Sequence, residues 1–206
     1  MKSSRHFSMI RDFHLADFLT LANGGSGTAA VFFAMDHVRE AHVGKLYAAG
    51  AAVGAALFFD VMDGRVARWR HQSSPMGREL DSLADVISFG VAPAALAFAF
   101  GFTGLFDAAV LLFFVCCGIS RLARYNVTAE SLSAATGKVT YFEGTPIPSS
   151  VVLVALLCAL AAAGRYGPHI PLGIVGLGPW DLHPLVLLFA LSGALMVSKT
   201  LHIPKP

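Results

Sequence analysis

Long apolar stretches separated by short polar connections run along the whole chain, and they predict a bundle of membrane helices. Crossing the bilayer core takes about 20 mostly apolar residues. The predicted helices cover about residues 16–35, 46–68, 81–100, 105–124, 149–163 and 183–198. We therefore expect an all-α integral membrane protein, a six-transmembrane-helix bundle that forms one domain over residues 1–206. Residues 1–14 are polar and partly basic, and we expect them on the cytoplasmic side as a short interfacial segment.

The composition agrees with a membrane location and excludes a nucleic-acid partner. Hydrophobic residues make up 55% of the chain and charged residues only 14%, whereas soluble domains carry about 25% charged residues. The net charge of +2 is small, and no basic run accompanies it. Cys116, Cys117 and Cys158 lie in apolar segments without the spacing of a metal site, which favours a packing role.

The distribution of positive charge predicts the orientation. With six spans and a cytoplasmic N-terminus, twelve of the 15 Lys and Arg residues fall on the cytoplasmic side, and Arg39, Lys45 and Arg165 fall outside. Positive charge concentrates in the cytoplasmic loops of membrane proteins. We therefore expect a multi-pass protein of the cell (inner) membrane, with both termini and the candidate site facing the cytoplasm.

Four aspartates interrupt the apolar pattern around the second and third predicted helices. Asp60 and Asp63 lie one helical turn apart, and Asp81 and Asp85 follow at a four-residue spacing. An Asp at bilayer depth costs about 2.5–3.5 kcal/mol on insertion scales, so the cluster needs a cation or a functional role. Two antiparallel helices would bring both pairs to one end of a shared interface. Oxygen ligands of this kind suit Mg²⁺, Mn²⁺ or Ca²⁺ better than zinc.

Neighbouring residues favour a substrate that is anionic at one end and lipid-like at the other. Gly64 lacks a side chain, so a nucleotide could lie against the helix, and Arg68 offers paired hydrogen bonds to phosphate. A divalent ion among the carboxylates would bridge pyrophosphate oxygens. Asp85 lies one turn deeper than Asp81, so it could accept a proton from an attacking hydroxyl.

A run of small residues from Gly24 to Gly27 lies inside the first predicted helix. The run could allow close helix packing, or it could form a loop that holds a phosphate. Packing is favoured, because the run lies within a spanning segment and lacks the Lys-Ser/Thr pair of a phosphate loop.

The two aspartate motifs together resemble the signature of the CDP-alcohol phosphotransferase family. The matching residues are Asp60-x-x-Asp63-Gly64-x-x-Ala67-Arg68 and Gly77-x-x-x-Asp81-x-x-x-Asp85. The resemblance implies that family's six-helix bundle, a homodimer, and one or two Mg²⁺ or Mn²⁺ ions, with Ca²⁺ less favoured. It also implies that Asp85 is the catalytic base and that the metal ligands are Asp60, Asp63, Asp81 and Asp85. The residues around the CDP-lipid would be Asp60, Asp63, Gly64, Ala67, Arg68 and Gly77.

Other segments are similar to the phosphatidylserine synthase branch of that family. They are Leu80–Asp85 with Ser88–Pro93, the SRLARYN segment from Ser120 and the YFEGTPIP segment from Tyr141. The implied reaction transfers the phosphatidyl group from CDP-diacylglycerol to L-serine and releases CMP, in phospholipid biosynthesis. Thr145 departs from the Leu of many bacterial relatives, and the first helix lacks the Pro-Asn start that is common in the superfamily.

L-serine needs a cation for its carboxylate and an anion for its ammonium group. Arg121, Arg124 and Glu143 are the charged residues on the expected face. The two arginines could instead anchor a helix end at the membrane surface, and Glu143 could be an ordinary loop residue.

Three alternatives stand beside this prediction. An enzyme of the same family could use glycerol 3-phosphate or an inositol phosphate as acceptor, or an archaeal-type lipid as donor. A cation-coupled transporter would also carry carboxylates in membrane helices, but the inverted repeats that are usual for transporters are not visible. A purely structural bundle would leave four buried aspartates unexplained.

Overall fold

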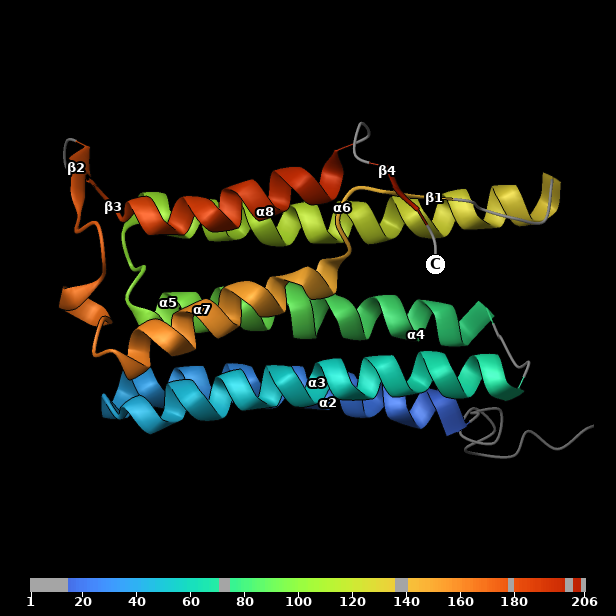
Figure 1. The fold of residues 1–206 in the computed structure, drawn as a ribbon, viewed down its shortest axis with the longest axis horizontal. Coiled ribbons are helices and arrows are strands. Elements are labelled where there is room, and N and C mark those ends of the chain that lie inside the picture. Colours follow the sequence, from blue (N-terminus) through green and yellow to red (C-terminus); the bar gives the residue numbers. More distant parts are fainter. Residues whose placement is uncertain (1–14, 71–74, 136–140, 178–179, 199–201, 205–206) are drawn as a thin grey trace, which may run out of the picture.

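The computed structural model describes residues 15–70, 75–135, 141–177, 180–198 and 202–204. Its helices lie side by side along one long axis (Figure 1). Residues Val86–Val91 form a π-helical turn that joins α4 and α5 into one long helix. The predicted interfacial segment 1–14 lies outside the described residues. The helices are α2 (Leu15–Glu40), α3 (Val43–Arg70), α4 (Pro75–Asp85), α5 (Ala92–Phe100), α6 (Leu105–Ala135), α7 (Val151–Ala162) and α8 (Leu187–Val197).

Four helical segments are long and apolar enough to cross a membrane, namely Leu15–Glu40, Val43–Val66, Met76–Phe100 and Leu105–Thr128. The segments Ile147–Ala162 and Pro184–Val197 are apolar but shorter. Large apolar side chains such as Phe32, Phe58 and Leu112 face outward, as a lipid environment requires. The protein is thus a helical multi-pass membrane protein with four candidate spans, and the number of six spans stays a prediction.

Two helices extend well beyond the predicted apolar stretches. Helix α6 continues past Arg124 to Ala135, because no glycine or proline interrupts that segment. Helix α4 begins at Pro75, ahead of the predicted start at Asp81, and proline suits a first turn where its missing N–H is not needed. Asp81 and Arg121 therefore lie inside regular helices, which hold their side chains more rigidly than helix ends would.

The helices pack in two groups that share one core. Helices α2 and α3 pack against each other and against the α4–α5 helix, while α6 packs against α8. Helix α7 contacts both α3 and α5, and it crosses between the two groups (Figure 1). Buried aromatic rings fill the interior, and Phe114 of α6 meets Phe189 of α8 edge to face with ring centroids 5.3 Å apart.

The glycine run of α2 brings that helix very close to α4 and the π-helical turn. A Cβ added at Gly27 would lie 2.6 Å from the Cα of Ser88, and one added at Gly24 would lie 3.4 Å from the Cβ of Ala84. A Cβ added at Gly25 would meet no atom within 4 Å. The predicted packing role of the run is confirmed, and it rests on Gly24 and Gly27.

We expect Gly27→Ala to destabilise the protein, because the backbones of α2 and the π-helical turn would have to separate. Overpacking of this kind costs about 1–3 kcal/mol. The matched variant Gly25→Ala adds the same methyl group to open space, so we expect it to be neutral or slightly stabilising. Thermal unfolding of both purified variants in detergent tests this, and equal melting temperatures would contradict it.

The π-helical turn accommodates Pro93 and follows directly after Asp85. The N–H of Ala92 bonds to the carbonyl of Ile87, five residues earlier, and Pro93 has no N–H to continue the usual pattern. The hydroxyl of Ser88 in this turn donates to the backbone carbonyl of Asn23 at 2.9 Å. The turn thereby joins the α4–α5 helix to α2 next to the aspartate motifs.

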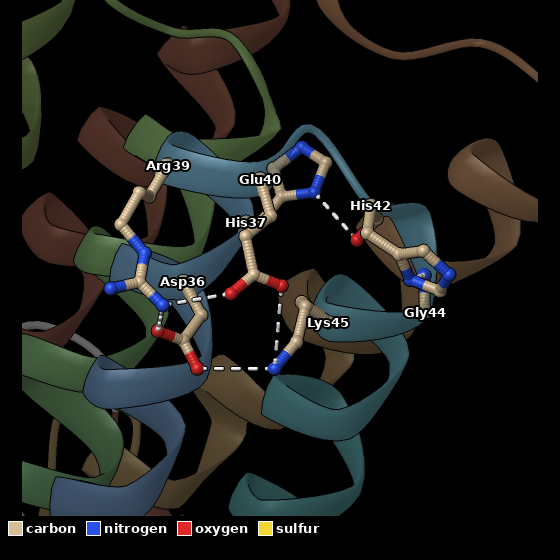
Figure 2. Close-up of polar contacts among 7 residues, drawn as sticks. All are labelled: Asp36, His37, Arg39, Glu40, His42, Gly44 and Lys45. Carbon is tan, nitrogen blue, oxygen red and sulfur yellow. Dashed lines mark hydrogen bonds and ion pairs between the residues drawn. The ribbon is translucent and has the colours of Figure 1, made fainter.

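An ion-pair network closes the turn between α2 and α3 (Figure 2). Lys45 lies 3.1 Å from Asp36 and 3.7 Å from Glu40, and Arg39 pairs with the same two acids. Exposed pairs of this kind contribute little to stability. The network lies at the end of the bundle opposite to the aspartate motifs (Figure 1).

Two short antiparallel ribbons complete the fold. Strand β1 (Tyr141–Glu143) pairs with β4 (His202–Pro204), and β2 (Val175–Leu177) pairs with β3 (Trp180–Leu182). After β1 the chain docks on the last turn of α8, where the N–H of Thr145 donates to the carbonyl of Leu195 at 3.2 Å. The buried Ile147 then packs against Gly118 of α6.

Candidate active site and metal centre

The two aspartate motifs meet between α3 and α4. One carboxylate oxygen each from Asp60, Asp63 and Asp81 lies within 4.8 Å of the others. Asp60 and Asp63 share a face of α3, and Asp81 approaches from α4, which follows after a short connection. The juxtaposition predicted from the sequence is therefore present.

The donor set and its surroundings fit a divalent cation. Three carboxylates this close repel one another in a low-dielectric setting. Among the described residues, the Oδ1 atom of Asp81 is buried without a hydrogen-bond partner, which is costly for an acceptor. Carboxylate oxygens are the ligands that hard cations prefer. The partly buried Asp triad could thus bind a metal ion through Asp60, Asp63 and Asp81.

Asp85 lies beside this triad, one helical turn after Asp81 on α4. It is only 7% exposed, and its charge interacts with those of Asp60 and Asp81. Its Oδ1 atom accepts a hydrogen bond from the side-chain amide of Asn23 at 3.2 Å. This position suits a group that takes part in proton transfer next to a metal, while its own contact with a metal stays a prediction.

Helix α2 contributes polar side chains that the sequence analysis did not assign to the site. Asp17, Thr20 and Asn23 are all buried, at a three-residue spacing on one face of the helix. The hydroxyl of Thr20 donates to Oδ2 of Asp63 at 2.7 Å. The signal that could have revealed them is this polar stripe inside an apolar span, because polar groups there need partners.

The residues predicted around the nucleotide lie next to the triad. Gly64 follows Asp63 on α3, and a Cβ added there would lie 3.9 Å from both terminal nitrogens of the exposed Arg68. Gly77 lies on α4, one turn before Asp81. The side chain of Ala67 lies outside the described part of the structure. The space beside Gly64 and the nearby guanidinium suit a phosphate-bearing ligand, and the individual roles stay predictions.

The structure separates the two arginines predicted to bind serine. The guanidinium of Arg121 is buried, lies 5.9 Å from the ring centroid of Tyr125, and interacts with the charge of Asp85. The guanidinium of Arg124 instead donates to the carbonyl of Val197 at 3.4 Å, at the end of α8. Arg121 thus interacts with Asp85 and Arg124 contacts the end of α8, while the role of each arginine toward serine stays a prediction.

Glu143, the third residue predicted to bind serine, lies in strand β1, where it is paired with His202. Its side chain falls outside the described part of the structure. Its role toward serine therefore stays a prediction.

Comparison with known proteins matches residues 13–197 to the CDP-alcohol phosphatidyltransferase family. The chain belongs to this family. All described helices fall within the matched range, which also includes both aspartate motifs and Arg121. The family assignment made from the aspartate motifs is thus confirmed.

Several relatives of this chain carry names that refer to serine transfer or to a serine lipid. The CDP-diacylglycerol–serine O-phosphatidyltransferase of Saccharomyces cerevisiae is 45% identical over 204 residues, which cover 98% of this chain and 74% of the relative. The enzyme of the same name from Mycobacterium leprae is 36% identical over 71% of this chain and 47% of its own length. An archaetidylserine synthase from Methanothermobacter thermautotrophicus is 36% identical over 68% of this chain and 56% of its own length.

Proposed function

We propose that this protein is a phosphatidylserine synthase, which transfers the phosphatidyl group of CDP-diacylglycerol to L-serine and releases CMP. The observation that carries the proposal is the cluster of Asp60, Asp63 and Asp81 next to the buried Asp85, with the buried Arg121 near enough to Asp85 for their charges to interact. The extensive similarity to a yeast enzyme of that name supports the same activity. Proteins named for serine transfer among the relatives favour serine over a phosphorylated acceptor.

The donor binds across α3 and α4 in this proposal. Arg68 holds phosphate oxygens, and Gly64 leaves room for the cytidine to lie against the helix. A Mg²⁺ or Mn²⁺ ion bound by Asp60, Asp63 and Asp81 would neutralise charge on the pyrophosphate when present. The diacyl tails lie along the outward-facing apolar surface of the membrane helices.

Asp85 accepts the proton of the serine hydroxyl. As the proton moves to the carboxylate, the serine oxygen forms a bond to the phosphorus of the phosphatidyl group. The bond between that phosphorus and the oxygen of CMP breaks, and CMP leaves with the electron pair. A buried carboxylate one turn deeper than the triad is well placed for this role, because it is shielded from bulk water.

Arg121 binds the carboxylate of serine. Arg121 is 9% exposed, and no hydrogen bond or ion pair to its guanidinium is found within the described ranges. Ile147 packs against Gly118, one turn before Arg121 on α6, so the loop from Gly144 to Pro148 lies next to this part of the helix. The hydroxyl of Thr145 in that loop is buried without a partner among the described residues, so it is available to a polar acceptor.

We expect Arg121→Lys to raise the KM for serine about tenfold or more, with a much smaller change in the KM for CDP-diacylglycerol. Lysine keeps the charge but cannot form the paired hydrogen bonds of a guanidinium with a carboxylate. Arg124→Lys is the matched control, because it changes the contact with Val197 and should affect stability more than either KM. Steady-state kinetics of both variants test this, and equal losses for the two substrates in Arg121→Lys would assign it a structural role.

The site faces the cytoplasm in this proposal, and the protein acts as a homodimer. Support for the orientation is the excess of Lys and Arg on the predicted cytoplasmic side. Helix α4, the C-terminal half of α6 and strand β1 lie in the same half of the bundle (Figure 1). All candidate groups can therefore act from one face of the membrane.

The experiment that tests the function is CMP release by the purified protein in detergent, with CDP-diacylglycerol and Mn²⁺. L-serine, glycerol 3-phosphate and inositol phosphate are compared as acceptors, and an archaeal-type CDP-lipid is compared as donor. We expect release that requires both the metal and serine. Release with a phosphorylated acceptor alone would move the protein to another branch of the family, and no release with any acceptor would refute the transferase activity.

A further inference from the structure

Asn23 of α2 is completely buried and contacts the proposed catalytic base directly. Its side-chain amide donates to Oδ1 of Asp85 at 3.2 Å, and its residue exposure is 0%. An ionised carboxylate only accepts hydrogen bonds, so the amide presents its nitrogen to Asp85 and its oxygen away from it. That oxygen is buried without a partner among the described residues.

The backbone around Asn23 is held against the residues on both sides of Asp85. Gly24 packs on Ala84, and the hydroxyl of Ser88 donates to the carbonyl of Asn23 at 2.9 Å. The amide therefore cannot shift independently of the α4 segment that carries Asp85. A donor in such a fixed position restricts the orientation of the carboxylate it bonds to.

We propose that Asn23 is a positioning residue that engages Oδ1 of Asp85 and leaves Oδ2 free to receive the proton of the acceptor hydroxyl. This inference rests on the proposed function and specifies how its base is oriented. The proton moves from the hydroxyl to Oδ2, while the acceptor oxygen bonds to phosphorus and CMP departs with the electrons of the broken bond. Asn23 itself neither gains nor loses a proton and touches no reacting atom.

Thr20 lies one turn earlier on the same face of α2, and its contact differs from that of Asn23. Its hydroxyl bonds to Asp63, a member of the triad, and not to Asp85. Loss of this bond should therefore act on metal affinity. Loss of the Asn23 bond should act on the proton-transfer step and leave metal affinity unchanged.

The test compares Asn23→Leu, Asn23→Ser, Thr20→Val and the control Ser26→Ala in purified protein. Leu has similar bulk but no donor, while Ser is small and keeps a hydroxyl that can act directly or through a water. The hydroxyl of Ser26 bonds to the carbonyl of Ala22 within α2, so this variant should behave like the wild type. The measurements are kcat and KM for serine and donor at saturating Mn²⁺, and Mn²⁺ binding by electron paramagnetic resonance.

We expect Asn23→Leu to lower kcat about ten- to a hundredfold, the range that a small misplacement of a catalytic group costs. Both KM values and the Mn²⁺ affinity should stay within about twofold, and Asn23→Ser should recover part of kcat. Thr20→Val should instead weaken Mn²⁺ binding. Retention of Mn²⁺ binding shows that a slow variant is folded.

An Asn23→Leu protein with wild-type kcat would overturn the inference and leave the proposed function intact. A change confined to KM or to Mn²⁺ affinity would also overturn the inference, because Asn23 would then contribute to substrate or metal binding and not to proton transfer. Failure of Asn23→Ser to recover any kcat, with Mn²⁺ binding retained, would also count against it. If the wild-type protein itself shows no serine-dependent CMP release, both the function and this inference fail.

Discussion

Asp85→Asn should reduce serine-dependent CMP release by about 10²- to 10⁴-fold, the contribution typical of a positioned general base. The substitution keeps the shape of the side chain, and the new amide oxygen can still accept the hydrogen bond from Asn23. The loss would thus reflect the missing proton acceptor and not a rearranged site. Donor binding should persist, because the triad of Asp60, Asp63 and Asp81 is unchanged.

The measurement for Asp85→Asn combines CMP release with binding of radiolabelled CDP-diacylglycerol. Asp181→Asn is the matched control, since this exposed aspartate lies in β3 at the opposite end of the bundle (Figure 1). It should leave turnover and binding unaffected. Undiminished turnover in Asp85→Asn would show that another group takes the proton.

Asp81→Asn should abolish activity through the metal. The Oδ1 atom of Asp81 is buried and has no hydrogen-bond partner in the described part of the chain, so a cation is its expected neighbour. We expect Mn²⁺ affinity to fall by at least about 100-fold, the upper end of the cost of altering groups that merely support a metal ligand. CMP release should fall with it at any practical Mn²⁺ concentration.

The same variant should become more stable when metal is absent. Replacing one of several mutually repelling carboxylates by a neutral amide removes like-charge repulsion. In EDTA, Asp81→Asn should therefore unfold at a higher temperature than the wild type. In Mn²⁺ the order should reverse, because only the wild type gains about 2.7 kcal/mol from a ligand at 100 times its Kd. Equal stabilisation of both proteins by Mn²⁺ would exclude Asp81 as a ligand.

Much of the candidate site was predictable because its residues follow helical spacing. Asp60 and Asp63 had to share a face of one helix, and Asp81 and Asp85 had to share a face of the next. A short connection between two antiparallel helices left few ways to arrange them. The meeting of Asp60, Asp63 and Asp81 was therefore expected before their positions were known.

The contribution of α2 was not predictable in the same way. Asp17, Thr20 and Asn23 carry the spacing of one helix face, but nothing in that spacing says which other helix the face meets. Asn23 reaches Asp85 because Gly24 and Gly27 let α2 approach α4 and the π-helical turn closely. Thr20 reaches Asp63 across the contact between α2 and α3. Contacts between residues far apart in the chain depend on packing, which local pattern does not encode.

The different contacts of Arg121 and Arg124 are a second example of packing that the local sequence pattern does not predict. Both lie on one face of α6 at a three-residue spacing, so the sequence could assign them the same role. In the folded protein the end of α8 provides a carbonyl for Arg124, while Arg121 lies toward Asp85. The position of α8 therefore determines the contact that Arg124 makes, and the role of either arginine toward serine stays a prediction.

By itself the sequence determined that this is a helical membrane protein, that it belongs to the CDP-alcohol phosphatidyltransferase family and that its aspartates converge. These features follow from composition, from helical periodicity and from residues at short fixed spacings, all of which are local. Only the tertiary structure decided which helix supports the aspartates, which arginine interacts with Asp85, and that the Thr145 hydroxyl has no partner among the described residues. Those features arise where helices distant in sequence pack together, and the free energy of that packing depends on the whole bundle.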